Sequence, residues 1–339
     1  MLKINRFVGL LMVICFFASL LTACSDDTPD ATTTGQADSS PGFEEMHSGE
    51  RESQSGLLDA VSDIMVAGNG ENDNKSGGVS DEDAWRIRVV DTSGGEIWSF
   101  TEEELIETGQ DQINAFTHVY STINNWPSTR FLVAGGYSVK SILEMAGALE
   151  TVQTISFRAA DGYEASLTRE QLFGEQYYYP KAGESEDGAE PVMPIIAYRW
   201  REGTTNLSEL RDEKPTLIFG QRYMSEHTNP AFVEEVAEIV IDTAPCEIWA
   251  AASTFPLPGS IAEGETVKLQ HQFYGIVKMF YTLDGSDPTT ASKMYNPSTY
   301  QPELNVPIPI TEHTIIKVLV TGYGKKDSEI STFEFDPTG

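Results

Sequence analysis

The stretch Ser121–Gly136 reads STINNWPSTRFLVAGG and decides how the first folded part of this chain is interpreted. It overlaps the end of Phe116–Ile123, whose alternating side chains are typical of a β-strand. It precedes Val139–Ala146, whose apolar spacing predicts a helix. The stretch holds adjacent hydroxyl side chains but no cysteine. We interpret it as a loop from a strand toward a helix, with Trp126 as a core anchor and Pro127 as a turn former.

Short strands and short helices alternate on both sides of this stretch. Two hairpins are expected, one of them with an Asp-Gly turn, and two helices begin at threonine caps. This mixture predicts an α+β domain over residues 84–244. The predicted elements are hairpins at 85–100 and 154–167, helix starts at Thr101 and Thr168, and strands at 215–222 and 236–241.

Residues 245–336 have a different pattern, with short alternating strands, many turns and almost no helix signal. This is typical of a small β-sandwich. The predicted strands are Glu265–Gln270, Val277–Leu283, Thr314–Thr321 and Ser328–Phe335.

The first 23 residues resemble a bacterial lipoprotein signal peptide. A short basic region is followed by the apolar run Phe7–Leu21 and then by Leu21-Thr22-Ala23-Cys24, which resembles a lipobox. We therefore expect lipidation at Cys24 and an extracytoplasmic location at the cell membrane. Residues 24–83 are rich in Ser, Thr, Gly and acidic residues, which predicts a disordered stalk.

Charge and cysteine content narrow the classes of partner. The chain has 22 basic and 52 acidic residues, and removal of Lys3 and Arg6 with the signal leaves 20 − 52 = −32. Such a charge argues against nucleic acid as a partner. With Cys15 removed and Cys24 lipidated, Cys246 has no intrachain partner for a disulfide.

The second part resembles the immunoglobulin-like domain found C-terminal in chitobiase and β-hexosaminidase. The resemblance rests on Phe280–Thr289, Pro307–Ile310, Thr314–Val318 and Asp327–Glu329. In that family the domain is an accessory module and not the hydrolase. Asp284 and Asp287 are interpreted as turn formers.

The first part resembles the oxidoreductase molybdopterin-binding domain of the sulfite-oxidase superfamily, through Trp126, Gly136–Leu143, Ala159–Ala165 and Leu217–Arg222. The resemblance implies a sulfite-oxidase-like α+β fold. It also implies a cysteine ligand to molybdenum, at a position that falls on Thr122 here, or on Ser121 with a one-residue shift of the alignment. A hydroxyl replaces a thiolate poorly.

A second argument concerns export, because members of that family bind the cofactor in the cytoplasm and leave through the twin-arginine route. Lys3 and Arg6 form no adjacent arginine pair. We therefore expect no cofactor, with molybdopterin as the alternative.

The candidate ligand or cofactor pocket is assigned to Thr122, Trp126, Arg130, Asp161, Tyr163 and Arg222. Arginine suits phosphate and carboxylate, although in so acidic a chain it also pairs with Asp and Glu. No catalytic or metal-binding set is assigned, since His118 and His227 lie in no ligand spacing. His118 is expected to be structural and His227 to be at the surface.

Three functions remain open. The preferred one is a lipid-anchored binding or scaffolding protein that is not an enzyme. The alternatives are a molybdopterin-dependent oxidoreductase without the cysteine ligand, and a binder of cell-wall glycan or polysaccharide through the C-terminal module. The expected partners are the membrane, through the lipid, and a wall glycan or surface protein.

Overall fold

The computed structural model describes residues 84–108 and 115–338. These residues belong to one compact unit, Ser76–Gly339. The predicted signal peptide, Cys24 and the predicted stalk lie outside the described residues. Within the described ranges, no helix combines the length and the apolar character needed to cross a bilayer.

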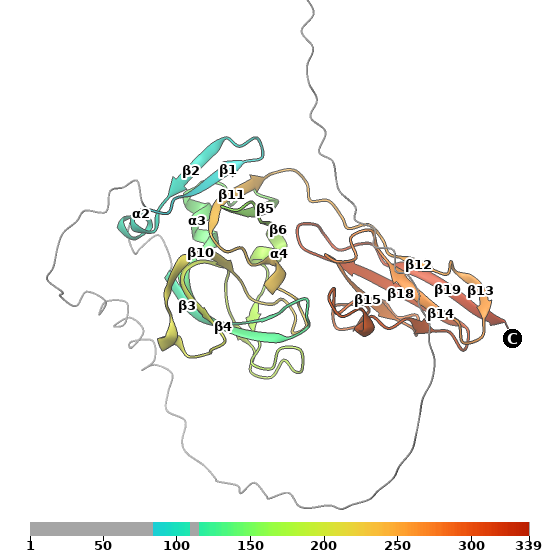
Figure 1. Ribbon diagram of the computed structural model, residues 1–339. Coiled ribbons are helices and arrows are strands. Elements are labelled where there is room, and N and C mark those ends of the chain that lie inside the picture. The colour runs from blue at the N-terminus through green and yellow to red at the C-terminus, as the bar shows by residue number, and fades with distance from the viewer. Residues whose placement is uncertain (1–83, 109–114, 339) are drawn as a thin grey trace, which may run out of the picture. The chain divides into compact units, whose positions relative to one another are not determined.

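A five-stranded sheet organises one side of the first part (Figure 1). Its strand order is β2-β1-β11-β5-β6, with β1 parallel to β11 and the other neighbours antiparallel. The strands are β1 (Ile87–Asp91), β2 (Glu96–Phe100), β5 (Thr154–Ala159), β6 (Glu164–Thr168) and β11 (Val236–Asp242). Both predicted hairpins are therefore present, and Gly162 at the Asp161-Gly162 turn has a φ of 92°, which favours glycine.

A four-stranded antiparallel sheet, in the order β10-β9-β4-β3, forms the other side. Its strands are β3 (Ala115–Ile123), β4 (Thr129–Ser138), β9 (Ile195–Glu202) and β10 (Asp212–Ile218). A short pair, β7 (Tyr177–Tyr178) and β8 (Glu190–Pro191), adds to this part. One apolar core joins both sheets, with Ile155 and Ile239 from the first and Ile196 and Leu217 from the second.

The predicted sulfite-oxidase-like α+β fold is wrong. Strands far outweigh helices in the described chain, whose three α-helices have only five to seven residues each: α2 (Glu102–Glu107), α3 (Val139–Met145) and α4 (Arg169–Phe173). Thr101 and Thr168 do form capping boxes with Glu104 and Gln171. A cap satisfies the first turn of a helix but does not extend it, because helices this short depend on packing. The architecture is mostly β and sandwich-like.

The stretch Ser121–Gly136 is a strand hairpin, so its interpretation as a loop from a strand toward a helix is wrong. Strands β3 and β4 pair from Ala115 with Tyr137 to Ile123 with Thr129, so only residues 124–128 form the turn. Gly136 lies at a register shift where β4 meets β9, and a Cβ there would stand 2.0 Å from the Ile196 carbonyl oxygen. The glycine therefore permits close strand contact.

The second part is a β-sandwich with its own core (Figure 1). A three-stranded sheet, β12-β14-β17, and a five-stranded sheet, β13-β19-β18-β15-β16, both contribute to this core. The first sheet comprises β12 (Ser253–Phe255), β14 (Thr266–Gln270) and β17 (Ile308–Pro309). The second comprises β13 (Gly259–Ala262), β15 (Lys278–Thr282), β16 (Lys293–Met294), β18 (Thr314–Thr321) and β19 (Ser331–Thr338). Three 3₁₀ turns also lie in the described ranges: η1 (Leu207–Glu209), η2 (Asn229–Ala231) and η3 (Pro302–Leu304).

Gln171 of α4 ties the two parts together. Its side-chain Nε2 donates to the carbonyl oxygens of Gly322 and Lys325, both at 2.8 Å, and its Oε1 accepts from the Gly324 amide at 2.9 Å. Tyr323 also packs its ring against Phe219, with the centroids 5.9 Å apart. The residue that completes a helix cap therefore also holds the second part in contact with the first.

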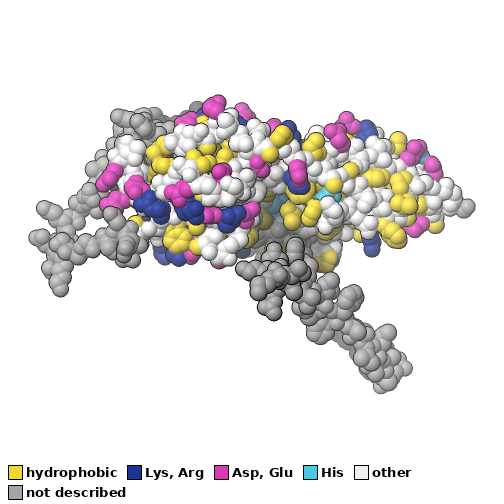
Figure 2. All heavy atoms as spheres, turned by 90° about the horizontal axis from the view of Figure 1, so that it is seen from above, with side chains coloured by type: hydrophobic (Ala, Val, Ile, Leu, Met, Phe, Trp, Pro, Cys, Tyr) yellow, Lys and Arg dark blue, Asp and Glu magenta, His cyan; other side chains and the backbone are white. Residues whose placement is uncertain are grey.

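Ion pairs account for many basic side chains of the first part. Figure 2 shows Lys and Arg side chains lying beside Asp and Glu side chains on the visible face. Arg88 and Arg158 both contact Glu238, at 2.8 and 2.6 Å. Pairing of this kind leaves few cations free to bind a ligand. A buried cation without an ion-pair partner is therefore a candidate for ligand binding.

Candidate functional site

A cavity of about 460 Å³ lies where the two parts meet; we call it the junction cavity. Its volume falls in the range of about 300–1,000 Å³ that is usual for small-molecule sites. The first part contributes Asn125, the start of β6 and the segment after β10, and the second contributes residues beside β15 and β18. The residues used below are Asn125, Tyr163, Arg222, Glu226, His227, Lys278 and Tyr323.

One wall of the junction cavity carries a fully paired charge cluster. The Arg222 guanidinium donates to Glu226 Oε1 at 2.8 and 2.5 Å, and the Arg222 amide donates to Glu226 Oε2 at 2.6 Å. The Tyr323 hydroxyl donates to the same carboxylate at 3.0 Å. Burial alone lowers the pKa of Arg222, but the Glu226 carboxylate outweighs it and the pKa is raised. The Arg222 guanidinium is therefore charged, and its hydrogen bonds go to the Glu226 carboxylate.

Lys278 carries a buried charge without such compensation. Its side chain lies at the first position of β15 and the residue is only 8 % exposed. Nζ donates to Asn125 Oδ1 at 3.4 Å and to the carbonyl oxygens of Asn296 and Pro297 at 3.3 Å each. No carboxylate of the described residues forms an ion pair with it. Burial lowers its pKa to about 8, as expected when a charged form loses water.

His227 adds an unsatisfied polar atom to the same cavity. It is 8 % exposed, so the predicted surface position is wrong, and its Nδ1 has no hydrogen-bond partner. Burial, and then the Lys278 charge, lower its pKa to about 3, against a smaller opposing effect of the Asn124 backbone. The ring is neutral at pH 7. Nδ1 is therefore a buried nitrogen atom without a hydrogen-bond partner among the described residues.

The structure brings together only part of the predicted site. Tyr163 and Arg222 both line the junction cavity, and the Tyr163 hydroxyl donates to the Pro230 carbonyl at 2.5 Å. Asp161 is exposed and accepts from the Tyr163 amide at 2.9 Å, as a turn former does. Trp126 is 55 % exposed, so its predicted role as a core anchor is wrong.

The other two predicted residues lie elsewhere. Thr122 is buried beside a cavity of about 180 Å³, where its hydroxyl accepts from Thr228 Oγ1 at 2.6 Å. Arg130 is at the surface and pairs with Glu202 at 2.5 Å. Neither side chain lines the junction cavity.

These placements do not fit a molybdopterin site. The hydroxyl at Thr122 is engaged by Thr228 and is a poor ligand for a metal that prefers thiolate. The two arginines expected at the phosphate, Arg130 and Arg222, are each paired with a glutamate and line different cavities. The six residues of the predicted site therefore do not line one pocket, and only Tyr163 and Arg222 share a cavity.

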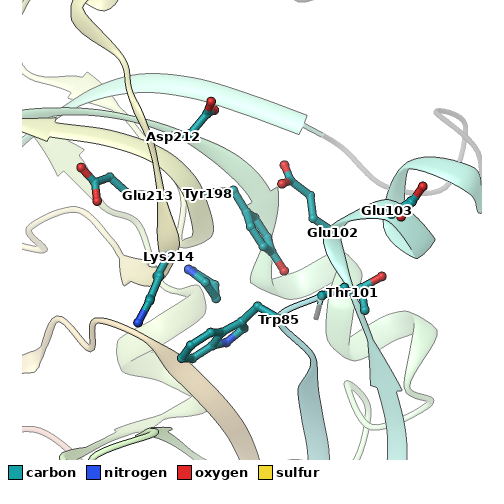
Figure 3. Close-up of a pocket in the computed structure, with 10 residues that line it drawn as sticks. Trp85, Thr101, Glu102, Glu103, Tyr198, Asp212, Glu213 and Lys214 are labelled. Carbon is teal, nitrogen blue, oxygen red and sulfur yellow. The ribbon is translucent and has the colours of Figure 1, made fainter. Parts of the chain in front are cut away.

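A second hollow, on the first part, is shown in Figure 3. Tyr198 directs its hydroxyl between Glu102 and Trp85, and Lys214 lies beside the indole, with Nζ 4.9 Å from the ring centroid. Glu102 pairs with Arg199 at 3.0 Å, while burial raises its pKa despite that partner. The hollow is open to solvent and its one cation among the described residues, Lys214, pairs with Glu235 at 2.9 Å, so it is a weaker candidate than the junction cavity.

Sequence reasoning missed five of the seven residues used above: Asn125, Glu226, His227, Lys278 and Tyr323. The sequence offered a reason to consider Glu226, because this acidic residue lies four positions after Arg222 and pairs with it. It offered another for Lys278, as a lone lysine in the apolar run Val277–Tyr281. The meeting of Glu226 and Lys278 with Tyr163 depends on segments more than 50 residues apart.

Comparison with known proteins supports the assignment of the second part at a coarse level. The sequence profile of the Fn3-associated family matches residues 267–335, which run from β14 into β19. The match agrees with an immunoglobulin- or fibronectin-like β-domain in this region. No curated protein matches the chain.

Proposed function

We propose that this protein is a lipid-anchored, extracytoplasmic binding protein whose ligand is an anion held in the junction cavity. The carrying observation is Lys278, a buried ammonium that lines the cavity without an ion-pair partner in the described chain. Burying an unpaired charge costs several kcal/mol, of the order of 3–5 when a partner is missing. A ligand carboxylate would offset that cost.

Binding fits these residues better than catalysis. Arg222 and Glu226 neutralise each other, and Tyr323 donates into the same pair. His227 is neutral at pH 7, with a pKa near 3, which is far from the operating pH that favours a general base. The cavity thus offers a positive charge, Lys278, without an activated nucleophile.

The anchor and the C-terminal module complete the proposal. The sequence Leu21–Cys24 supports lipidation at Cys24. One acyl chain gives only weak membrane binding, so stable attachment requires a second. Residues 245–336 support an accessory module of the chitobiase C-terminal kind, here supplying one wall of the binding site. Radiolabelled palmitate should enter the wild-type protein and not a Cys24→Ser variant; labelling of that variant would contradict the anchor.

Calorimetric titration of the chain from Ser25 with galacturonate, lactate and citrate at pH 7 tests the anion site. At least one should bind with a dissociation constant below about 1 mM, which corresponds to about −4 kcal/mol. Lys278→Met should weaken that binding at least tenfold. Lys268→Met, at an exposed position of β14, is the matched control and should leave it unchanged. Absence of binding by all three anions, or equal binding by both variants, would refute the proposal.

The proposal requires no cofactor, and no observation here favours the oxidoreductase alternative. Metal analysis and pterin fluorescence of protein purified from its own membrane provide the check. Molybdenum or tungsten at one atom per chain would contradict a cofactor-free binding protein.

A further inference from the structure

Three exposed aromatic side chains lie at the edge of the junction cavity; we call them the aromatic platform. They are Trp126, Tyr163 and Tyr300, which are 55 %, 48 % and 67 % exposed. The Trp126 and Tyr300 rings are 6.4 Å apart and tilted by 31°. Tyr163 lines the junction cavity, whereas Trp126 and Tyr300 belong to two loops that meet at Asn125, one of the residues lining that cavity. Rings this exposed add little to the core of the protein.

Side-chain hydrogen bonds fix the backbone under the aromatic platform. Asn124 Oδ1 accepts from the Trp126 amide at 3.0 Å and from the Ser128 amide at 3.2 Å. Ser298 Oγ accepts from the Tyr300 amide at 3.2 Å and donates to the Asn125 carbonyl at 2.9 Å. The two aromatic loops therefore form one hydrogen-bonded network, which lowers the entropy lost when a ligand binds.

Asn125 links the aromatic platform to the charged cavity. Its carbonyl accepts from Ser298, as above, and its side-chain Oδ1 accepts from Lys278 Nζ at 3.4 Å. Tyr163 also lines the cavity itself, with its hydroxyl held by Pro230. A ligand that reaches Lys278 thus has the aromatic platform beside it.

We infer that the ligand is an acidic oligosaccharide, with a sugar carboxylate at Lys278 and a neighbouring sugar ring stacked on the aromatic platform. This inference rests on the proposed anion-binding function and names the ligand class. The C–H groups on one face of a pyranose carry partial positive charge and match the negative face of an aromatic ring.

An acidic peptide is the main competing class, since it too carries carboxylates and apolar groups. The aromatic platform favours the sugar, because the exposed Trp126 and Tyr300 rings offer faces on which a pyranose ring can stack. A peptide of glycine and glutamate has no ring to place there.

The experiment uses the chain from Ser25 at pH 7 and follows tryptophan fluorescence and calorimetric heat. The acidic probes are the tetrasaccharides of galacturonic acid, mannuronic acid and hyaluronan. The comparison probes are maltotetraose, galacturonate alone and the peptide acetyl-Gly-Glu-Gly-Glu-amide. At least one acidic tetrasaccharide should bind at least tenfold more tightly than every comparison probe. Failure of all three acidic tetrasaccharides to do so, or tighter binding of the peptide, overturns the inference.

Variants separate the inference from the proposed function. Trp126→Ala and Tyr300→Ala should each weaken tetrasaccharide binding at least tenfold and change galacturonate binding less than twofold. Phe255→Ala, at an aromatic position that is 64 % exposed and does not line the cavity, is the control. If Lys278→Met abolishes binding while the aromatic variants do not, the anion site stands and the sugar ligand is refuted. If only the aromatic variants matter, the anion site is refuted. Circular dichroism of every variant confirms folding.

Discussion

The segment Arg222–Glu226 and the strand start at Lys278 both place a buried cation in the junction cavity, and they treat it differently. Arg222 has a glutamate four residues away and bonds it through backbone and side chain. Lys278 has only three oxygen atoms of uncharged groups, at 3.3–3.4 Å. A local partner makes a buried charge structural. A charge without one leaves free energy available for a ligand, at the expense of the unliganded fold.

Glu226→Gln should have the largest effect on stability. It removes the carboxylate that pairs with Arg222, so that Arg222, like Lys278, has no ion-pair partner in the described chain. We expect a loss of about 3–5 kcal/mol in the free energy of unfolding, typical of a buried pair with one partner removed. Urea denaturation measures it. Glu202→Gln, which removes the partner of the exposed Arg130, should cost less than about 1 kcal/mol. Similar losses for both would mean that burial of the Arg222 pair adds nothing.

The pH dependence of stability isolates Lys278. Its pKa is about 8 in the folded protein and near 10.5 unfolded. Between these values the unfolded state binds more protons, so stability rises with pH. The rise attributable to Lys278 is about 3 kcal/mol at most. Neighbouring groups, including His227, Arg222 and Glu226, also enter the profile, so the quantity measured is wild type minus Lys278→Met from pH 7 to 10.5. If the difference in the free energy of unfolding does not change with pH, the charged form of Lys278 is not destabilised by burial.

Lys278→Met should stabilise the unliganded protein at pH 7 by about 1–2 kcal/mol. Removing the buried charge gains more than this, but Asn125, Asn296 and Pro297 each lose a donor, which returns part of the gain. Thermal or urea unfolding without ligand gives the value. If the variant is instead less stable than the wild type, Lys278 contributes to the contact between the two parts. Its charge would then be structural, as that of Arg222 is.

Arg130→Ala is the smallest effect we expect. Its ion pair with Glu202 has side chains 47 % and 42 % exposed, and pairs of this kind contribute about 0–1 kcal/mol. The change in unfolding free energy should stay below about 0.5 kcal/mol, and anion binding should not change. Weaker anion binding by this variant would mean that Arg130 belongs to the binding site, as the sequence analysis proposed.

Local chemistry could be predicted where neighbouring residues decide it. The Thr101 and Thr168 caps form with Glu104 and Gln171 because the partners are three residues apart. The Asp161-Gly162 turn forms because glycine accepts a positive φ. The β-sandwich of the second part followed from the spacing of its turns and strands.

The same reasoning failed where pairing over distance decides the structure. Thr129–Ser138 seemed part of a loop, yet it becomes a central strand because β3 and β9 supply partners on both sides. Trp126 seemed apolar enough for the core, but the β3–β4 turn leaves it beside Tyr300 at the surface. Propensity and composition carry no information about which strand will be the neighbour.

The sequence alone determined the acidic charge, the predicted lipid signal, the caps and turns, and the β-rich second part, because each depends on composition or on residues a few positions apart. Tertiary structure decided that the first part is mostly β and that Tyr163, Arg222, His227 and Lys278 line one cavity. It also decided which cation is paired and which is not. Burial sets the free energy of a charge, and burial exists only once the chain has folded.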